Sequence, residues 1–266
     1  VASGDSCYLV YMGSAQQTVT APAGSIVSSQ FSSADIGITG SLGVGTTSPH
    51  ADLHIQNQTG TNTGSTELNL WVNDDRGRSK FNLKSTDDGT SVGTFKLTTE
   101  STVPSNTDLL IMNNQGIMTV PNQPAFLARK SSDTSNIAVD TAVTIVFDTE
   151  VFDQNADYNN SNGIFTAPVT GRYQINAMVY MGAVPNDANY FLIELVASNR
   201  SVQDIFRTQA GDAEWTYQSF QINILLDMDA SDTAKINVYQ PNGTAQADIQ
   251  GHSTHAHTSF SGYLVA

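Results

Sequence analysis

The chain has 266 residues, and 25 acidic against 11 basic side chains give it a formal net charge of −14. This excess of carboxylates argues against nucleic-acid binding, which needs a basic face to displace counterions from phosphates. Cys7 is the only cysteine, which excludes an intrachain disulfide and a zinc site built from several thiolates. No apolar run approaches the ~18–20 residues of a membrane span, so no membrane insertion is predicted.

Apolar and polar residues alternate through most of the sequence, and no long segment shows the 3.6-residue period of an amphipathic helix. Together with the many Thr, Ser, Asn and Gly residues, this pattern predicts an all-β chain. The sequence does not open with a charged segment followed by an apolar stretch, so no signal peptide is predicted.

Residues 1–40 are small and polar, with short apolar pieces at 8–12 and 25–27. One interpretation is a flexible or edge-paired arm, and the other is an attachment segment that orders on a partner. A glycine-rich stretch, residues 38–49, follows. We assign residues 1–49 to an N-terminal arm with a Gly/Ser/Thr-rich lead-in, the candidate for attachment.

Residues 50–120 are assigned to a β-strand module, in which residues 64–120 are predicted to form an antiparallel meander with turn sequences at 74–78, 87–89 and 113–116. Each predicted strand offers only two or three apolar side chains on one face. Such a sheet is marginal alone and needs a second layer. We therefore expect it to bury that face against copies of itself.

Residues 121–266 are predicted to be a sandwich. In the segment Gly163–Tyr173, Pro168 cannot donate to a strand ladder, so we expect a strand that ends there or lies at an edge, followed by a turn at Gly171. Alternation predicts that one strand directs three apolar side chains inward: Ile222, Ile224 and Leu226. On the last strand, Phe260, Gly262 and Leu264 share one face, and Ser259, Ser261 and Tyr263 share the other.

Several segments within residues 121–266 resemble, in the right order, the strands of the globular head of complement component C1q, a relative of the TNF jelly roll. They lie at 124–128, 143–148, 151–155, 163–173, 218–226, 232–238 and 259–264, with Tyr158 at the family's tyrosine position. The resemblance implies a jelly-roll β-sandwich that assembles as a homotrimer. It also implies that the last strand lies in the sheet around the threefold axis. Ser259, Ser261 and Tyr263 are therefore the candidate trimer contacts.

Three histidines, His252, His255 and His257, occur within six residues. If the last strand extended over them, His255 and His257 would point toward the side of Tyr263, and a threefold axis would gather three imidazoles around an axial metal ion. The alternative is a polar, solvated approach to that strand. Apart from this metal, no cofactor is predicted. Asp227, Asp229 and Asp232 have a spacing that invites calcium, but a turn explains them better.

The sequence contains no Gly-x-Ser-x-Gly, phosphate-binding glycine loop or His-Glu-x-x-His, and we predict that the protein is not an enzyme. Among the aromatic residues Tyr180, Tyr190, Trp215 and Tyr217, we expect mostly core or interface positions, with one or two left to stack on a sugar. No ligand-binding residues are assigned.

The stretch 43–49, followed by alternation at 51–55, resembles the lead-in of bacteriophage tail-fibre and other virion proteins. It implies a trimeric tail or head fibre on the external surface of a phage particle. Its expected partners are other virion proteins, through the N-terminal region, and a host surface glycan or protein. A capsid decoration protein that clamps shell subunits through its arm is the alternative, and a secreted C1q-like lectin is a weaker one.

Overall fold

The computed structural model describes residues 42–44, 50–51, 53–55, 63–74, 77–88, 94–100, 107–207 and 215–266. Within these ranges all regular elements are β-strands, as predicted, and no helix is present that could cross a membrane. The chain divides into two units, Val1–Gly60 and Thr61–Ala266. The predicted arm at residues 1–40 lies outside the described residues.

In the first unit, β1 (Leu42–Val44) pairs in parallel with β2 (Leu53–Ile55). Leu42, Val44 and Leu53 are about half exposed, so this small sheet buries little apolar surface.

The second unit begins with a five-stranded antiparallel meander, which confirms the expected strand pattern. Its strands are β3 (Thr63–Asp74), β4 (Gly77–Asp88), β5 (Thr94–Glu100), β6 (Thr107–Asn113) and β7 (Met118–Thr119). The predicted turn after β6 is present, because the Asn113 side-chain oxygen accepts hydrogen bonds from the backbone N–H groups of Gln115 and Ile117 at 3.0 and 2.9 Å. Gly116 has a φ of +79°, a conformation that glycine adopts readily.

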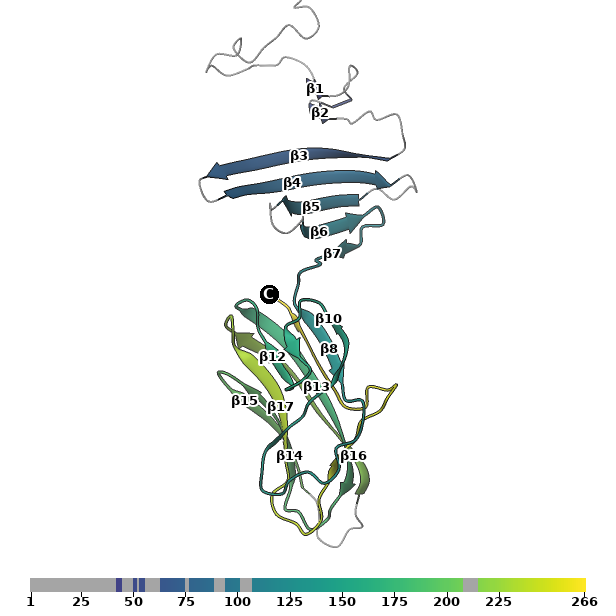
Figure 1. Ribbon diagram of the computed structural model, residues 1–266, viewed down its shortest axis with the longest axis vertical. Coiled ribbons are helices and arrows are strands. Elements are labelled where there is room, and N and C mark those ends of the chain that lie inside the picture. The colour runs from purple at the N-terminus through teal and green to yellow at the C-terminus, as the bar shows by residue number, and fades with distance from the viewer. Residues whose placement is uncertain are drawn as a thin grey trace, which may run out of the picture. The chain divides into compact units, whose positions relative to one another are not determined.

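Residues 121–266, which we call the head, form a sandwich of two sheets, whose strands run in two layers in Figure 1. The front sheet has the order β10 (Thr149–Asp153), β8 (Ala125–Arg129), β19 (Ser259–Leu264), β13 (Gly171–Val184), β16 (Trp215–Met228), with β18 (Asp248–Ile249) paired to β13. The back sheet has the order β11 (Tyr158–Asn159), β12 (Ile164–Thr166), β17 (Thr233–Tyr239), β14 (Phe191–Ala197), β15 (Ser201–Phe206), with β9 (Val143–Thr144) paired to β17.

Alternate residues of both sheets fill the space between them. Ile222 and Leu226 are buried and Ile224 packs against them, which confirms the predicted inward face of β16. Phe126 lies at the centre of an aromatic cluster, with the rings of Phe165, Phe260 and Tyr158 at 4.8, 5.0 and 5.1 Å. Aromatic pairs at these distances add to the stabilisation from burial.

The segment Gly163–Tyr173 joins the two sheets. β12 ends at Thr166, before Pro168, as predicted, but it lies between β11 and β17 and is not an edge strand. The predicted turn at Gly171 is wrong, because the chain turns over residues 167–170 and Gly171 is the first residue of β13. Close packing explains this glycine: a Cβ there would lie 2.6 Å from Leu264 Cδ1 and 2.7 Å from the Ala266 carbonyl oxygen.

The predicted strand at 143–148 is shorter than expected and ends at Thr144. Asp148 lies outside a strand, and its carboxylate accepts hydrogen bonds from the backbone N–H and the hydroxyl of Ser131, at 2.8 and 2.7 Å. These bonds join the segment after β8 to the segment before β10.

Candidate functional site

The front sheet has one side in the core and one side toward solvent. Strand register places the outward side chains of β19, β13 and β16 in rows, one of which is Ser261, Asn176 and Asn223. We call the central part of this outward surface the front face, and leave out of it one end, where Arg172 of β13 and Asp227 of β16 lie opposite one another and also project outward. Its residues are Gln174, Asn176, Met178, Tyr180, Tyr217, Ser219, Gln221, Asn223, Leu225, Ser259, Ser261 and Tyr263.

No side chain of the front face is charged, although the chain carries a net charge of −14. Three large side chains remain substantially exposed there: Tyr217 at 55%, Tyr263 at 49% and Leu225 at 48%. A surface of this kind can pack against another protein without desolvating an ion or opposing like charges. Its chemistry is therefore suited to protein association.

The three predicted trimer contacts all lie on this face. Ser259, Ser261 and Tyr263 project outward from β19, which lies between β8 and β13, while Phe260 and Gly262 are buried on the opposite side. The predicted division of β19 into two faces is thus confirmed. That these three residues contact another copy stays a prediction.

Sequence reasoning missed the contribution of β13 and β16 to this face. Gln174 and Asn176 on β13 are joined by a hydrogen bond of 3.0 Å from Gln174 Nε2 to Asn176 Oδ1. The sequence feature that could have placed Gln174 and Asn176 on an outward face is their alternation with Tyr173 and Ile175, which are fully buried. Their position beside β19 depends on pairing between distant strands and could not be read from that alternation.

An aromatic recess lies at one end of the front face. The rings of Tyr180 and Tyr217 stack at 5.2 Å with an angle of 15° between them, and His257 meets Tyr180 edge-on at 5.5 Å. The recess, which has a volume of about 330 Å³, is lined by Met178, Tyr180, Ser219 and His257. Tyr217 is 55% exposed and therefore lies outside the core, so of the two expected positions only the interface is left for it, and that position stays a prediction.

The strand assumed for the histidines is not present. β19 begins at Ser259, and His252, His255 and His257 precede it in a bend, so strand alternation does not apply to His255 and His257. The argument that aimed these two side chains together at a threefold axis is therefore wrong. Among the residues that the structure describes, no group of three His, Cys, Asp or Glu side chains is arranged to hold a metal ion.

The imidazole of His252 organises this bend as a hydrogen-bond acceptor. Its Nδ1 atom accepts the backbone N–H groups of Thr254 and His255, both at 3.1 Å, and lies 2.9 Å from His255 Nδ1. The hydroxyl of Thr254 is 3.2 Å from the same atom. Because both amides donate to it, Nδ1 of His252 carries no proton.

Burial lowers the pKa of the His252 imidazole, and the nearby positive charges of His255, His257 and Arg129 lower it further, against the opposing effect of Asp133. The neutral ring is thus the form that suits this environment. Arg129 also fixes the bend from β8, because its guanidinium donates to the carbonyl oxygens of His252 and Ser253 at 2.6 and 2.8 Å.

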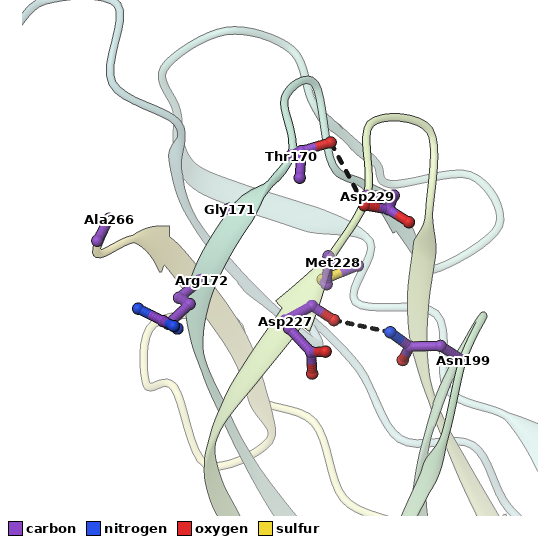
Figure 2. Close-up of a pocket in the computed structure, with 8 residues that line it drawn as sticks. All are labelled: Thr170, Gly171, Arg172, Asn199, Asp227, Met228, Asp229 and Ala266. Carbon is purple, nitrogen blue, oxygen red and sulfur yellow. Dashed lines mark hydrogen bonds between the residues drawn. The ribbon is translucent and has the colours of Figure 1, made fainter.

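The predicted turn at the three aspartates is confirmed. Asp229 N–H donates to Asp232 Oδ2 at 2.9 Å, while Asp227 lies on β16 and pairs with Arg200 at 2.5 Å. Figure 2 shows the recess beside this turn, where Thr170 contacts Asp229 and Asn199 Nδ2 donates to the Asp227 carbonyl oxygen at 2.8 Å. The three carboxylates are thus engaged in separate interactions and do not converge.

Comparison with models of known protein families identifies the family of this chain. The family model of the C1q domain matches residues 125–265, more than half of the chain, which confirms the resemblance seen in the sequence. Domains of this type are generally non-enzymatic and typically form homotrimers. No curated protein matches the chain.

Solved structures with a similar fold include the globular domain of zebrafish complement 1qA, with 18% identity over 55% of this chain and 98% of that chain and a TM-score of 0.40. Murine APRIL at pH 5.0 shows 12% identity over 54% and 100% of the two chains, with a TM-score of 0.39. Eiger TNF from S. frugiperda shows 10% identity over 54% and 91%, with a TM-score of 0.40.

Proposed function

Because this chain belongs to the C1q domain family, we propose that it is a non-enzymatic, homotrimeric structural protein. We further propose, from the lead-in sequence at residues 43–55, that it lies on the external surface of a bacteriophage particle. In this proposal it is a tail or head fibre. The C1q-type head contacts the host surface, and the N-terminal region binds other virion proteins.

The observation that carries the proposed trimer is the uncharged front face on an acidic chain. Copies that each carry a charge of −14 repel one another within a Debye length, about 8 Å at physiological salt, so a surface with few carboxylates is favoured for contact between copies. The front face is such a surface and leaves Leu225, Tyr217 and Tyr263 to bury apolar area. The number three comes from the family.

The lead-in sequence at residues 43–55 supports a position on a phage particle, through its resemblance to virion proteins. A trimer presents three copies of any weak binding site, and linked sites gain avidity without new contacts. A fibre would use this gain to hold a host glycan or protein for which one head has little affinity.

We place the host contact in the loops after β13 and β17, at the end of β13 opposite Arg172 and the C-terminal residue. These loops are tied together, because Thr244 donates from its N–H and its hydroxyl to Asp187 Oδ2, at 2.7 and 2.6 Å. Asn189 N–H also donates to Asn242 Oδ1 at 3.0 Å. Fixed loops at one end of a sandwich are a common scaffold for recognition.

Four experiments test this function. Gold-labelled antibody against the head should mark the outside of intact particles, and purified trimer should bind host cells and compete with infection. Binding to emptied shells, with a rise in their melting temperature, would support the decoration protein in place of the fibre. Deletion of residues 1–40 should remove the protein from particles and leave a soluble trimer. Particles without label would contradict a virion location.

A further inference from the structure

The aromatic recess of the front face combines exposed ring surface with neutral polar groups. Tyr180 lies in its wall, and the ring of Tyr217, which is 55% exposed, stacks on Tyr180 at 5.2 Å. Ser219 and His257 add a hydroxyl and an imidazole to the lining. None of the lining residues is acidic, and none is lysine or arginine. The recess therefore offers ring faces and hydrogen-bonding groups without a fixed charge.

A further polar group borders the recess beside Gly182. This glycine is paired with Tyr217 and lies two residues beyond Tyr180 on the same side of β13. A side chain at Gly182 would collide with the Nε2 atom of Gln250, so the absence of a Cβ makes room for the Gln250 amide. A side-chain amide supplies two hydrogen-bond donors and an acceptor at this place.

Buried hydrogen bonds fix these groups in place. Thr258 is fully buried, and its hydroxyl accepts the Tyr180 N–H at 3.0 Å and donates to the Gln250 carbonyl oxygen at 2.6 Å. The Gln250 N–H donates to the Tyr180 carbonyl oxygen at 2.8 Å. The side-chain amide of Gln250 takes no part in these bonds. Because the groups are held in position before a ligand enters, binding costs less conformational entropy.

We propose that the aromatic recess binds one neutral pyranose ring. The C–H face of the sugar packs on the stacked rings of Tyr180 and Tyr217. The sugar hydroxyl groups form hydrogen bonds with Ser219, His257 and Gln250. The volume of about 330 Å³ lies at the lower end of the roughly 300–1,000 Å³ of ligand pockets, which suits a single small ring.

Other classes of ligand fit these groups less well. A purely apolar ligand would remove the hydroxyl of Ser219 and the amide of Gln250 from water without giving them a partner, which is unfavourable. An ionic ligand would find no opposite charge in the lining. A neutral sugar carries an apolar face and a rim of hydroxyl groups, and it therefore matches both parts of the recess.

The recess is separate from the part of the front face that carries the other two exposed side chains. Tyr263 and Leu225 both pair with Gln174 on β13. Gln174 precedes Tyr180 by six residues, which span roughly 20 Å of strand. In the proposed trimer the contact between copies then rests on Leu225 and Tyr263, and the ring of Tyr217 is left to the sugar.

The recess lies toward the end of β13 at which we place the host contact. The sugar is therefore assigned to the end of a host surface glycan, and this assignment rests on the proposed function. The sugar site itself does not, because each head carries all the residues of the recess. A monomer should bind the same sugar as a trimer does.

The test uses the intact chain and the methyl glycosides of glucose, galactose, mannose and N-acetylglucosamine, with N-acetylneuraminic acid as an anionic comparison. Saturation-transfer NMR should show transfer from the protein to the C–H protons of at least one neutral glycoside. The dissociation constant should be on the order of 1 mM, since a ligand of this size makes few contacts. No transfer to any neutral glycoside at tens of millimolar, or tighter binding of the anionic sugar, would overturn the proposal.

Matched variants connect the binding to the recess. Tyr217→Ala should weaken it about tenfold, whereas Tyr217→Phe keeps the ring and should bind within about threefold of the unaltered chain. Ser219→Trp fills the recess and should abolish the transfer. Phe152→Ala removes a half-exposed ring from the edge strand β10 and should leave binding unchanged. Binding that survives both Tyr217→Ala and Ser219→Trp would contradict the site.

Sedimentation of the same samples separates the sugar site from the proposed trimer. A trimer that binds no neutral glycoside would overturn the site and leave the proposed assembly intact. A monomer that binds one through Tyr217 would support the site and contradict the assembly. Binding of a free sugar but not of its methyl glycoside would contradict the glycan end, because the glycoside carries a substituent on its anomeric oxygen as a glycan does.

Discussion

The two exposed faces of the head differ in how their polar side chains are used. On the back sheet, charged residues such as Glu194 and Lys235 point outward, and polar groups bond within the chain. Gln203 Nε2 donates to Glu194 Oε1 at 2.9 Å, and Thr144 Oγ1 donates to Asn237 Oδ1 at 2.9 Å. The front face has no charge and leaves Tyr263, Leu225 and Tyr217 about half exposed.

This difference indicates which face stays in water. A protein with a net charge of −14 that has no charged side chain in the central part of one sheet face is suited to place that part against a copy of itself. The back sheet also exposes one large apolar side chain, Ile205 of β15 at 57%, so the absence of charge distinguishes the front face more than its exposed apolar area does. The predictions below test whether the two faces behave differently when they are changed.

The largest effect is expected on the buried side of β19. Phe260→Ala removes a fully buried ring that contacts Phe126 at 5.0 Å, and should lower the free energy of unfolding by about 3–5 kcal/mol in denaturant titrations. Ser259→Ala, on the outward side of the same strand, should change it by less than about 0.5 kcal/mol. Similar losses in both variants would show that β19 is not divided into two faces.

A charge on the front face should weaken assembly. Tyr263→Arg places a guanidinium where we expect an interface, and the cost of burying it should weaken trimer association by about 100-fold in dilution series followed by light scattering. The matched variant Gln203→Arg adds the same charge to the back face and should leave assembly intact. Equal weakening by both variants would remove the distinction between the faces.

The third prediction compares a polar group satisfied inside the chain with one on the front face. The Tyr158 hydroxyl donates to the Phe147 carbonyl at 3.1 Å and accepts its N–H at 3.2 Å, and burial raises its pKa, so it stays protonated. Tyr158→Phe should cost about 1–2 kcal/mol of folding stability without changing assembly. Asn223→Ala removes a polar side chain from the front face, and should weaken assembly without changing folding stability. Thermal unfolding and sedimentation together distinguish them.

The smallest effect is expected on the pH dependence of unfolding in acid. Burial raises the pKa of Asp148, but hydrogen bonds from Ser131 outweigh it and the net shift is downward. A lowered folded pKa stabilises the head above the unfolded value of about 3.9, and that stabilisation is lost as the pH falls through the folded pKa. Ser131→Ala should therefore flatten the acid limb of unfolding between pH 5 and 2 and leave the front face unaffected. An unchanged acid limb would argue against this bond.

Alternation within single strands could be predicted from the sequence. It gave the two sides of β19 and the inward positions Ile222 and Leu226, because side chains alternate wherever a strand is regular. Gly171 could not be assigned in this way. Its role depends on Leu264 and Ala266, which approach it only after the sheet forms.

The histidine bend shows the same limit at the site. Spacing alone placed His255 and His257 on an extension of β19, but the strand stops at Ser259. The bend depends on Arg129, which reaches it from β8, more than 120 residues earlier. Contacts of this length leave no local pattern, so neither the bend nor the acceptor role of His252 was predictable.

The central claim is that the front face joins three copies of the chain. Sedimentation velocity of the intact protein at neutral pH and micromolar concentration tests it most directly. Three chains of 28.4 kDa should sediment as a species of about 85 kDa, and Tyr263→Arg should shift the mass toward one chain while Gln203→Arg does not. A single 28.4 kDa species from the unaltered chain would contradict the account.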